Sequence, residues 1–181
     1  MKRSDSTKEA LSKKKTSSST ARKWLKFIHI VFSMSWFGGD LSLILLLFFI
    51  PRPDSTSSLV LQQIIFIRLA TIIVAPASVL SLITGLLLCW KSNWGFFRYW
   101  WVIIKLFVTI LVIVFCIIIS GPAAEGLIEL SRTFGMEALH NEIYLNKKML
   151  ITIVQPVIFA LLIFLAYLSV FKPWGKRKSK Q

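Results

Sequence analysis

The amino-acid sequence predicts an all-α fold in which four helices cross a membrane as one polytopic bundle. The chain has 181 residues, 55% of them hydrophobic, and its mean hydropathy is +0.69. Soluble domains contain about 45–50% apolar residues, and a membrane-spanning helix needs about 20 largely apolar residues in succession. Four such runs occur, and they set the expected spans at residues 24–50, 59–90, 100–120 and 149–171.

Proline and glycine mark where these spans should end. The sequence PRPD follows the first run at residues 51–54, and Gly121-Pro122 follows the third. Because proline lacks the backbone N–H and clashes with the preceding turn, we expect helix three to stop there. In the loop beyond it, Leu127, Leu130 and Phe134 recur at helical spacing. This pattern predicts a short amphipathic helix on the outer membrane surface, between helices three and four.

Positive charge is concentrated at the two ends of the chain. The net charge is +14; nine Lys and Arg residues lie at or before Lys26, and five follow Phe171. Lys and Arg mark the cytoplasmic side of a spanning helix, so we expect a multi-pass cell-membrane protein with both termini in the cytoplasm. Because most of this charge lies at the ends, the stretches between provide no basic face for nucleic acid, and the basic ends favour anionic lipid head groups as partners.

The polar ends are expected to lie outside the transmembrane domain. Residues 1–23 are mainly Ser, Thr and Lys, with little to bury, so they are predicted to form a disordered basic tail. Residues 24–171 then form the transmembrane domain, and residues 172–181 form a second basic tail. The sequence leaves open whether this domain associates with itself or with another protein.

Small residues recur four apart on the first two runs. Ser35 and Gly39 do so on the first run, and Ala77, Ser81 and Gly85 do so on the second. Such rows let helix backbones approach closely in lipid. Helices one and two are therefore expected to pack along them.

Three polar side chains are predicted to meet inside the bundle. A charge in the hydrocarbon costs at least about 2.5–3.5 kcal/mol on insertion scales, so Asp40 and Arg68 each need a partner or a purpose. At about 1.5 Å per residue, Asp40 lies roughly 20 Å from an inner boundary near Phe27, and Arg68 roughly 10 Å below an outer boundary near Leu61. Gln155 falls at a similar level. We therefore predict a buried cluster of Asp40, Arg68 and Gln155, in which carboxylate and guanidinium pair.

A second candidate site lies nearer the cytoplasmic side. His29 on helix one and Lys105 on helix three fall roughly 3 Å and 8 Å inside the inner boundary. A histidine there can bind haem iron, accept a proton or make an ordinary hydrogen bond, and Lys105 can extend to the surface. Because His140 falls in the outer loop, two histidines cannot bind one haem across the bundle. Haem b or a porphyrin held by a single histidine stays open.

Cysteine usage predicts no metal site. Cys89 and Cys116 are the only cysteines, and neither has a CxxC spacing or a nearby histidine. The expected topology also places them near opposite faces of the bilayer, so no disulfide is expected. Two inert thiols in apolar surroundings are the simplest interpretation.

The order of several short motifs resembles that of HemJ-type protoporphyrinogen IX oxidases, which are small multi-helix membrane proteins. The matching elements are FIHI and WFGG on helix one, Arg68-Leu69, Pro76 and Thr84-Gly85 on helix two, Trp101 and Lys105 on helix three, and Asn141-Glu142 and Lys172-Pro173-Trp174 around the last helix. The resemblance spans residues 24–174 and implies a haem or porphyrin site at His29 and Lys105. Helix three lacks the histidines expected in that family, and Asp40 is additional.

The same skeleton also resembles other bacterial membrane proteins. The chain is more closely similar to an uncharacterised family of bacterial four-helix integral membrane proteins, and the membrane part of copper-resistance CopD proteins shares the arrangement. This resemblance implies the architecture rather than an activity.

Three functions stay open on the sequence alone. The first is a haem- or porphyrin-linked redox protein with its site at His29 and Lys105. The second is a small transporter or ion-handling protein that uses Asp40 and Arg68. The third is a non-catalytic membrane subunit in which that pair only fixes helix register. The sequence contains no Ser-His-Asp arrangement, nucleotide-binding loop or HExxH motif, so hydrolase and ATPase functions lack support.

Overall fold

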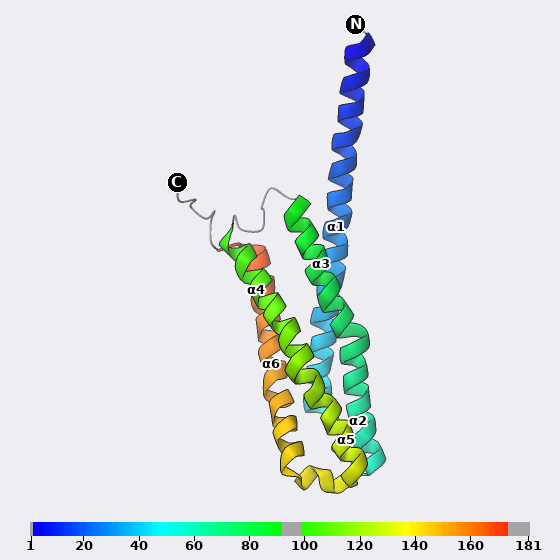
Figure 1. The fold of residues 1–181 in the computed structure, drawn as a ribbon, viewed down its shortest axis with the longest axis vertical. Helices are drawn as coiled ribbons and strands as arrows, with labels where there is room; N and C mark the ends of the chain where they lie inside the picture. The colour runs from blue at the N-terminus through cyan, green and yellow to red at the C-terminus, as the bar shows by residue number, and fades with distance from the viewer. Residues whose placement is uncertain (1, 92–98, 174–181) are drawn as a thin grey trace.

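The computed structural model describes residues 2–91 and 99–173 as a set of helices joined by short connections (Figure 1). In chain order they are α1 (Lys2–Phe49), α2 (Thr56–Leu69), the π-helical turn η1 (Ala70–Val74), α3 (Ala75–Lys91), α4 (Trp100–Phe115), the π-helical turn η2 (Cys116–Ser120), α5 (Gly121–Phe134), the 3₁₀ turn η3 (Gly135–His140) and α6 (Glu142–Phe171).

The helices form four columns: α1, α2–η1–α3, α4–η2–α5 and α6. We call the end where α3 stops and α4 starts the proximal end, and the end that holds α2, α5 and η3 the distal end (Figure 1). Around the bundle, α1 packs against α3, α3 against α4, α4 against α6, and α6 against α1. At the distal end α5 packs against both α2 and α6.

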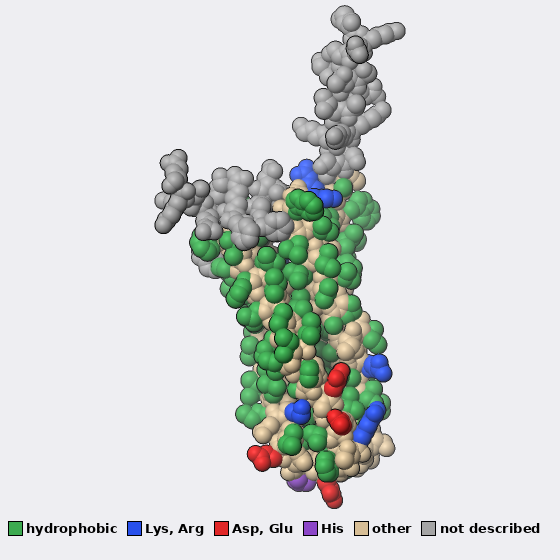
Figure 2. Space-filling view, in the orientation of Figure 1, with side chains coloured by type: hydrophobic (Ala, Val, Ile, Leu, Met, Phe, Trp, Pro, Cys, Tyr) green, Lys and Arg blue, Asp and Glu red, His purple; other side chains and the backbone are tan. Residues whose placement is uncertain are grey.

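Each column is long and apolar enough to cross a membrane. The candidate spans are Thr20–Phe49, Thr56–Lys91, Trp100–His140 and Glu142–Phe171. Figure 2 shows apolar side chains over the middle of the bundle, with acidic and basic side chains gathered over the distal end. The predicted fold class, an all-α four-helix membrane bundle, is confirmed.

The predicted N-terminal tail is helical in the structure, whereas most of the predicted C-terminal tail is not described. The backbone of α1 is helical from Lys2, so the helix includes residues 2–23, for which the sequence predicted no regular structure. Figure 1 shows this part of α1 extending beyond the end of α3. Extending an existing helix is cheap because nucleation is the costly step. Residues 174–181 of the predicted second tail lie outside the described residues.

Helix three does not end at Gly121-Pro122, so that prediction is wrong. In η2 the N–H of Gly121 bonds to the carbonyl of Cys116, five residues back, and the helix continues through Pro122 into α5. A π turn also precedes Pro76, where the N–H of Ala75 donates to the carbonyl of Ala70. The wider π turn makes room for a proline ring, which would crowd a regular helical turn.

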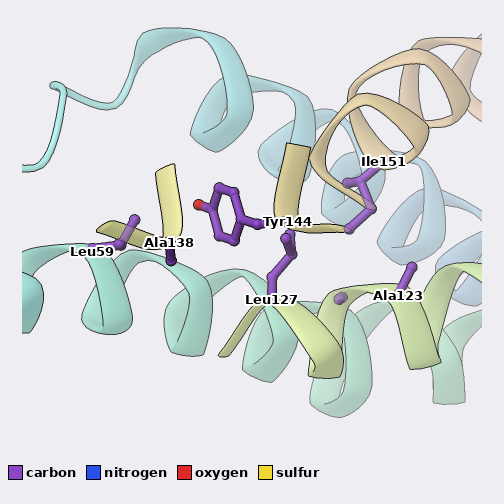
Figure 3. Close-up of a cluster of buried hydrophobic side chains, with 7 residues drawn as sticks. Leu59, Ala123, Leu127, Ala138, Tyr144 and Ile151 are labelled. Carbon is purple, nitrogen blue, oxygen red and sulfur yellow. The ribbon is translucent and has the colours of Figure 1, made fainter. Parts of the chain in front are cut away.

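Helix α5 is correspondingly part of the bundle rather than a separate helix lying on a surface. Its inner face buries Ala123, Ala124, Leu127 and Ser131 against neighbouring helices. The three apolar ones, Ala123, Ala124 and Leu127, belong to a distal core that also holds Leu59 of α2 and Tyr144 of α6, as Figure 3 shows for its labelled members. The amphipathic pattern was therefore recognised, but its apolar face packs on protein.

Helix α1 approaches η1 and α3 as closely as the row of small residues predicted. A Cβ added to Gly39 would lie 2.8 Å from Val74 Cγ2, and one added to Gly85 would lie 3.2 Å from His29 Cε1. Ser35, however, is exposed and donates its hydroxyl to the carbonyl of Val31 on its own helix. The interface serine of α1 is Ser33 instead.

Candidate functional site

A carboxyl and an amide face each other inside the bundle. Gln155 Nε2 on α6 donates a hydrogen bond to Asp40 Oδ1 on α1 at 2.6 Å. The two residues are only 4% and 2% exposed, respectively. The other carboxyl oxygen, Oδ2, is buried and has no hydrogen-bond partner among the described residues. This half-partnered carboxyl is unusual, because buried polar atoms are nearly always bonded.

The helices around Asp40 are irregular at this level. Gly39 lets Val74, the last residue of η1, approach α1, and Gln155 directly precedes Pro156 inside α6. Cys116, the first residue of η2, packs on the central core of Trp36, Ala77, Val112, Ile158, Leu162 and Leu165. The carboxyl therefore lies among three columns whose backbone hydrogen bonding is interrupted nearby.

Arg68 is not part of this cluster, although the sequence predicted that it would pair with Asp40. Its side chain is exposed and lines a groove between α2 and α5, and no hydrogen bond or ion pair within the described residues joins it to Asp40. The level of Asp40 on the second column is marked by Val74, which lies roughly 9 Å further along the helix than Arg68. The prediction placed the membrane boundary at Leu61, but α2 extends beyond it to Thr56.

His29 and Ser33 continue the inward face of α1 towards the proximal end. His29 Nδ1 lies 3.0 Å from Thr84 Oγ1 on α3, and Ser33 Oγ lies 2.8 Å from Ser81 Oγ one turn further on. Thr84 also donates to the carbonyl of Leu80 on its own helix at 2.7 Å, which fixes the hydroxyl that meets the imidazole. Residues 29, 33, 36 and 40 share one face because their spacing matches the helical repeat.

Lys105 is bonded to a different helix from His29. Its Nζ donates to Ser169 Oγ on α6 at 2.6 Å, and Ser169 in turn donates to the carbonyl of Leu165. Helices α1 and α4, which carry His29 and Lys105, do not pack against each other in the described structure. The two predicted site residues therefore bond to different helices and are not joined directly.

The sequence analysis missed a second buried polar cluster, in the distal core. Gln63 Nε2 on α2 donates to Ser131 Oγ on α5 at 2.9 Å and to Tyr144 Oη on α6 at 3.1 Å. Ser131 and Tyr144 are almost fully buried, and Gln63 Oε1 has no partner among the described residues. The helical spacing of Leu127 and Ser131 was a usable signal, but treating residues 121–148 as a surface loop hid it.

Two surface grooves are formed by described residues. One lies between α2 and α5 and carries Arg68, Glu125, Glu129 and Arg132; the other is mainly apolar and lies between α1 and α2. Neither groove is lined by Asp40, His29 or Lys105. Across the described residues no group of three His, Cys, Asp or Glu side chains could hold a metal ion, and neither Cys89 nor Cys116 forms a disulfide.

Fold and surface together define an integral membrane protein with four spanning columns. The chain belongs to the family DUF2269, described as a predicted integral membrane protein, whose model matches residues 23–173. No curated protein and no solved structure matches the chain. The similarity to HemJ-type oxidases and to CopD stays a prediction from the motifs.

Proposed function

We propose that this protein relays protons within the membrane, with the Asp40 carboxyl as the proton-binding group. The observation that carries the proposal is the buried carboxyl whose Oδ2 has no partner while Oδ1 accepts from Gln155. Such a carboxyl can take up or release a proton on Oδ2 without breaking its existing hydrogen bond. Ionisable residues inside spanning helices are commonly functional because an idle one would be costly.

The inward face of α1 supports a proton rather than a larger substrate. Neither groove is lined by Asp40, and a proton needs only hydrogen-bonding groups or water in order to move. The Ser33–Ser81 hydroxyl pair and the His29–Thr84 pair lie in succession between Asp40 and the proximal end. An imidazole ring has two nitrogen atoms, one of which can donate while the other accepts, which suits it to pass on a proton.

Trp36 is the barrier in this relay. Its side chain is buried in the central core on the same face of α1, between Ser33 and Asp40. Those two residues are roughly 10 Å apart along the helix, so a proton crosses this step through water admitted by a movement of Trp36. Until Trp36 moves, no proton passes between Ser33 and Asp40.

The proposal is tested by proton flux into liposomes that contain the purified full-length protein and an internal pH-sensitive dye. With an imposed membrane potential, we expect wild-type protein to acidify or alkalinise the lumen faster than empty liposomes do. Asp40→Asn should reduce the flux to that of empty liposomes, because asparagine can still accept from Gln155 but cannot exchange a proton. His29→Gln should slow it several-fold.

A matched control is Asp54→Asn, which removes an exposed carboxyl in the α1–α2 connection. It should leave the flux unchanged. Helical circular dichroism and a single size-exclusion peak establish that each variant is folded. A wild-type flux equal to that of empty liposomes, or an Asp40→Asn flux equal to wild type, contradicts the proposal.

The porphyrin hypothesis keeps one supporting observation. The Nδ1 atom of His29 is fixed by Thr84, as the second nitrogen of metal-binding histidines usually is by an outer partner. Against it, the ring lies on Gly85, and Lys105 is engaged by Ser169 on another helix. A porphyrin bound by these two residues would require both contacts to break. An absorption spectrum of the same preparation tests the porphyrin hypothesis. A Soret band that is lost in His29→Ala supports haem binding, and colourless protein expressed with ample haem excludes haem binding.

Location in the cell membrane with both chain ends in the cytoplasm belongs to the same proposal. The charge of Lys and Arg before Lys26 and after Phe171 supports this orientation. It would connect the His29 end of the relay with the cytoplasm. The basic ends would also attract anionic lipid of the inner leaflet.

A further inference from the structure

The groove between α2 and α5 carries charge of both signs at one place on the surface. It has a volume of about 480 Å³ and is lined by Arg68 and Thr71 from the second column and by Glu125, Glu129, Arg132 and Thr133 from α5. Figure 2 shows acidic and basic side chains side by side in the region where Figure 1 draws α2 and α5. The groove is separate from Asp40 and does not depend on the proposed relay.

The four charged side chains of this groove do not neutralise one another. Within the described part of the chain, none of Arg68, Glu125, Glu129 and Arg132 forms an ion pair or a side-chain hydrogen bond. Opposite charges that share a groove without pairing leave their donors and acceptors available for a ligand that carries both signs.

The groove also lies at a defined depth. Arg68 is roughly 34 Å along the helix from Lys91, and Glu125 roughly 37 Å from Trp100, at about 1.5 Å per residue. The hydrocarbon core of a bilayer is about 30 Å thick, so both side chains emerge just beyond it at the distal end. Further in, Ile72 lies one turn from Arg68 and Ile118 about two turns from Glu125; they are 65% and 66% exposed and face the depth of acyl chains.

We propose that this groove binds the head group of a zwitterionic phospholipid with a primary ammonium group, such as phosphatidylethanolamine. Arg68 and Arg132 would hold the phosphate, since a guanidinium can donate two parallel hydrogen bonds to it. Glu125 and Glu129 would accept from the ammonium, and the exposed isoleucines would contact the acyl chains. A quaternary ammonium, as in phosphatidylcholine, has no N–H to donate and would be bound less well.

Native mass spectrometry of the full-length protein in detergent tests this assignment. The protein is titrated with phosphatidylethanolamine and with phosphatidylcholine of the same acyl chains. We expect at least about tenfold tighter binding of the ethanolamine lipid, which corresponds to about 1.4 kcal/mol. Arg68→Gln should weaken binding of both lipids about tenfold, and Glu129→Gln should remove most of the preference between them.

Matched controls use charges at the same end but outside the groove. Arg52→Gln and Glu137→Gln remove exposed side chains and should leave both affinities unchanged. Free phosphoethanolamine should bind far more weakly than the lipid, because it lacks the acyl chains. Equal binding of the two lipids, wild-type binding by Arg68→Gln, or equally tight binding of free phosphoethanolamine would each overturn the proposal.

Discussion

Asp40 is held in the bundle by a neutral amide, and this changes what the residue can do. A guanidinium partner would have kept the carboxylate charged and engaged on both oxygens. The Gln155 amide engages only Oδ1 and leaves Oδ2 without a partner. Counting about 1.5 Å per residue was enough to bring Asp40 and Gln155 together from the sequence, because both distances start from clear ends of apolar runs. It failed for Arg68, because Val74 rather than Arg68 lies at the level of Asp40, roughly 9 Å further along the second column.

Adjacent glycines on α1 give a test of close packing at single-residue resolution. Gly39→Ala would place a Cβ 2.8 Å from Val74 Cγ2, whereas an added Cβ at Gly38 would meet nothing within 4 Å. We expect Gly39→Ala to destabilise the protein by about 1–3 kcal/mol through overpacking. Gly38→Ala should be neutral or stabilising by up to about 1 kcal/mol, because alanine favours the helix. Thermal unfolding in detergent measures both, and equal melting temperatures would contradict the close approach.

At the scale of helices, proline was an unreliable stop signal: PRPD does follow the end of α1 at Phe49, but Gly121-Pro122 does not end its helix. Pro76 lay inside a predicted span and Pro122 at a predicted end, yet each follows a π turn and neither ends its helix. Sequence alone does not distinguish a proline that ends a helix from one that a wider π turn accommodates, because every proline lacks the backbone N–H. Consequently the distal cluster of Gln63, Ser131 and Tyr144 was missed, because Ser131 was assigned to the membrane surface rather than to the bundle.

The pairing of α1 with α3 predicts a specific crosslink. In a background with Cys89 and Cys116 replaced by alanine, Ser33→Cys with Ser81→Cys should form an intramolecular disulfide under mild oxidation. The reason is that the two hydroxyl oxygens are 2.8 Å apart and cysteine closely matches serine in shape. Mass spectrometry of tryptic peptides before and after reduction detects the bond.

The control for this crosslink moves one cysteine by half a turn. Ser35→Cys with Ser81→Cys should stay reduced, because Ser35 is exposed and bonded to its own helix. A disulfide with Ser35→Cys and none with Ser33→Cys would mean that α1 is rotated from the described orientation.

For the whole molecule, the fold class followed from composition and from four apolar runs alone. Hydrocarbon excludes unpaired backbone groups, so long apolar runs have few structural choices besides spanning helices. The packing partners of those helices were less predictable, because lipid and protein interiors are equally apolar and give similar sequence patterns. Leu127 and Leu130 illustrate this: helical spacing showed an apolar face on α5, and only the structure showed that it packs towards α2 and α6.

Topology is predicted at the same scale and can be measured in intact cells. A cysteine introduced at Ser57, in a background lacking Cys89 and Cys116, should react with a membrane-impermeant maleimide, because the distal end is expected outside. A green fluorescent protein fused to the C-terminus should fluoresce, as it does only when folded in the cytoplasm of a bacterial host. A labelled proximal cysteine at Lys91 together with an unlabelled one at Ser57 would indicate the opposite orientation.

The π turns before Pro76 and Pro122, together with Pro156 beside Gln155, give the bundle a mechanical property. In three of the four columns the regular backbone hydrogen bonding of the helix is interrupted at a similar level of the bundle. The helices are therefore easiest to bend at that level. A tilt of the distal half against the proximal half would break few hydrogen bonds and would open the contacts around the lone carboxyl oxygen first. The layer of the bundle that bends most easily is thus the layer that holds Asp40.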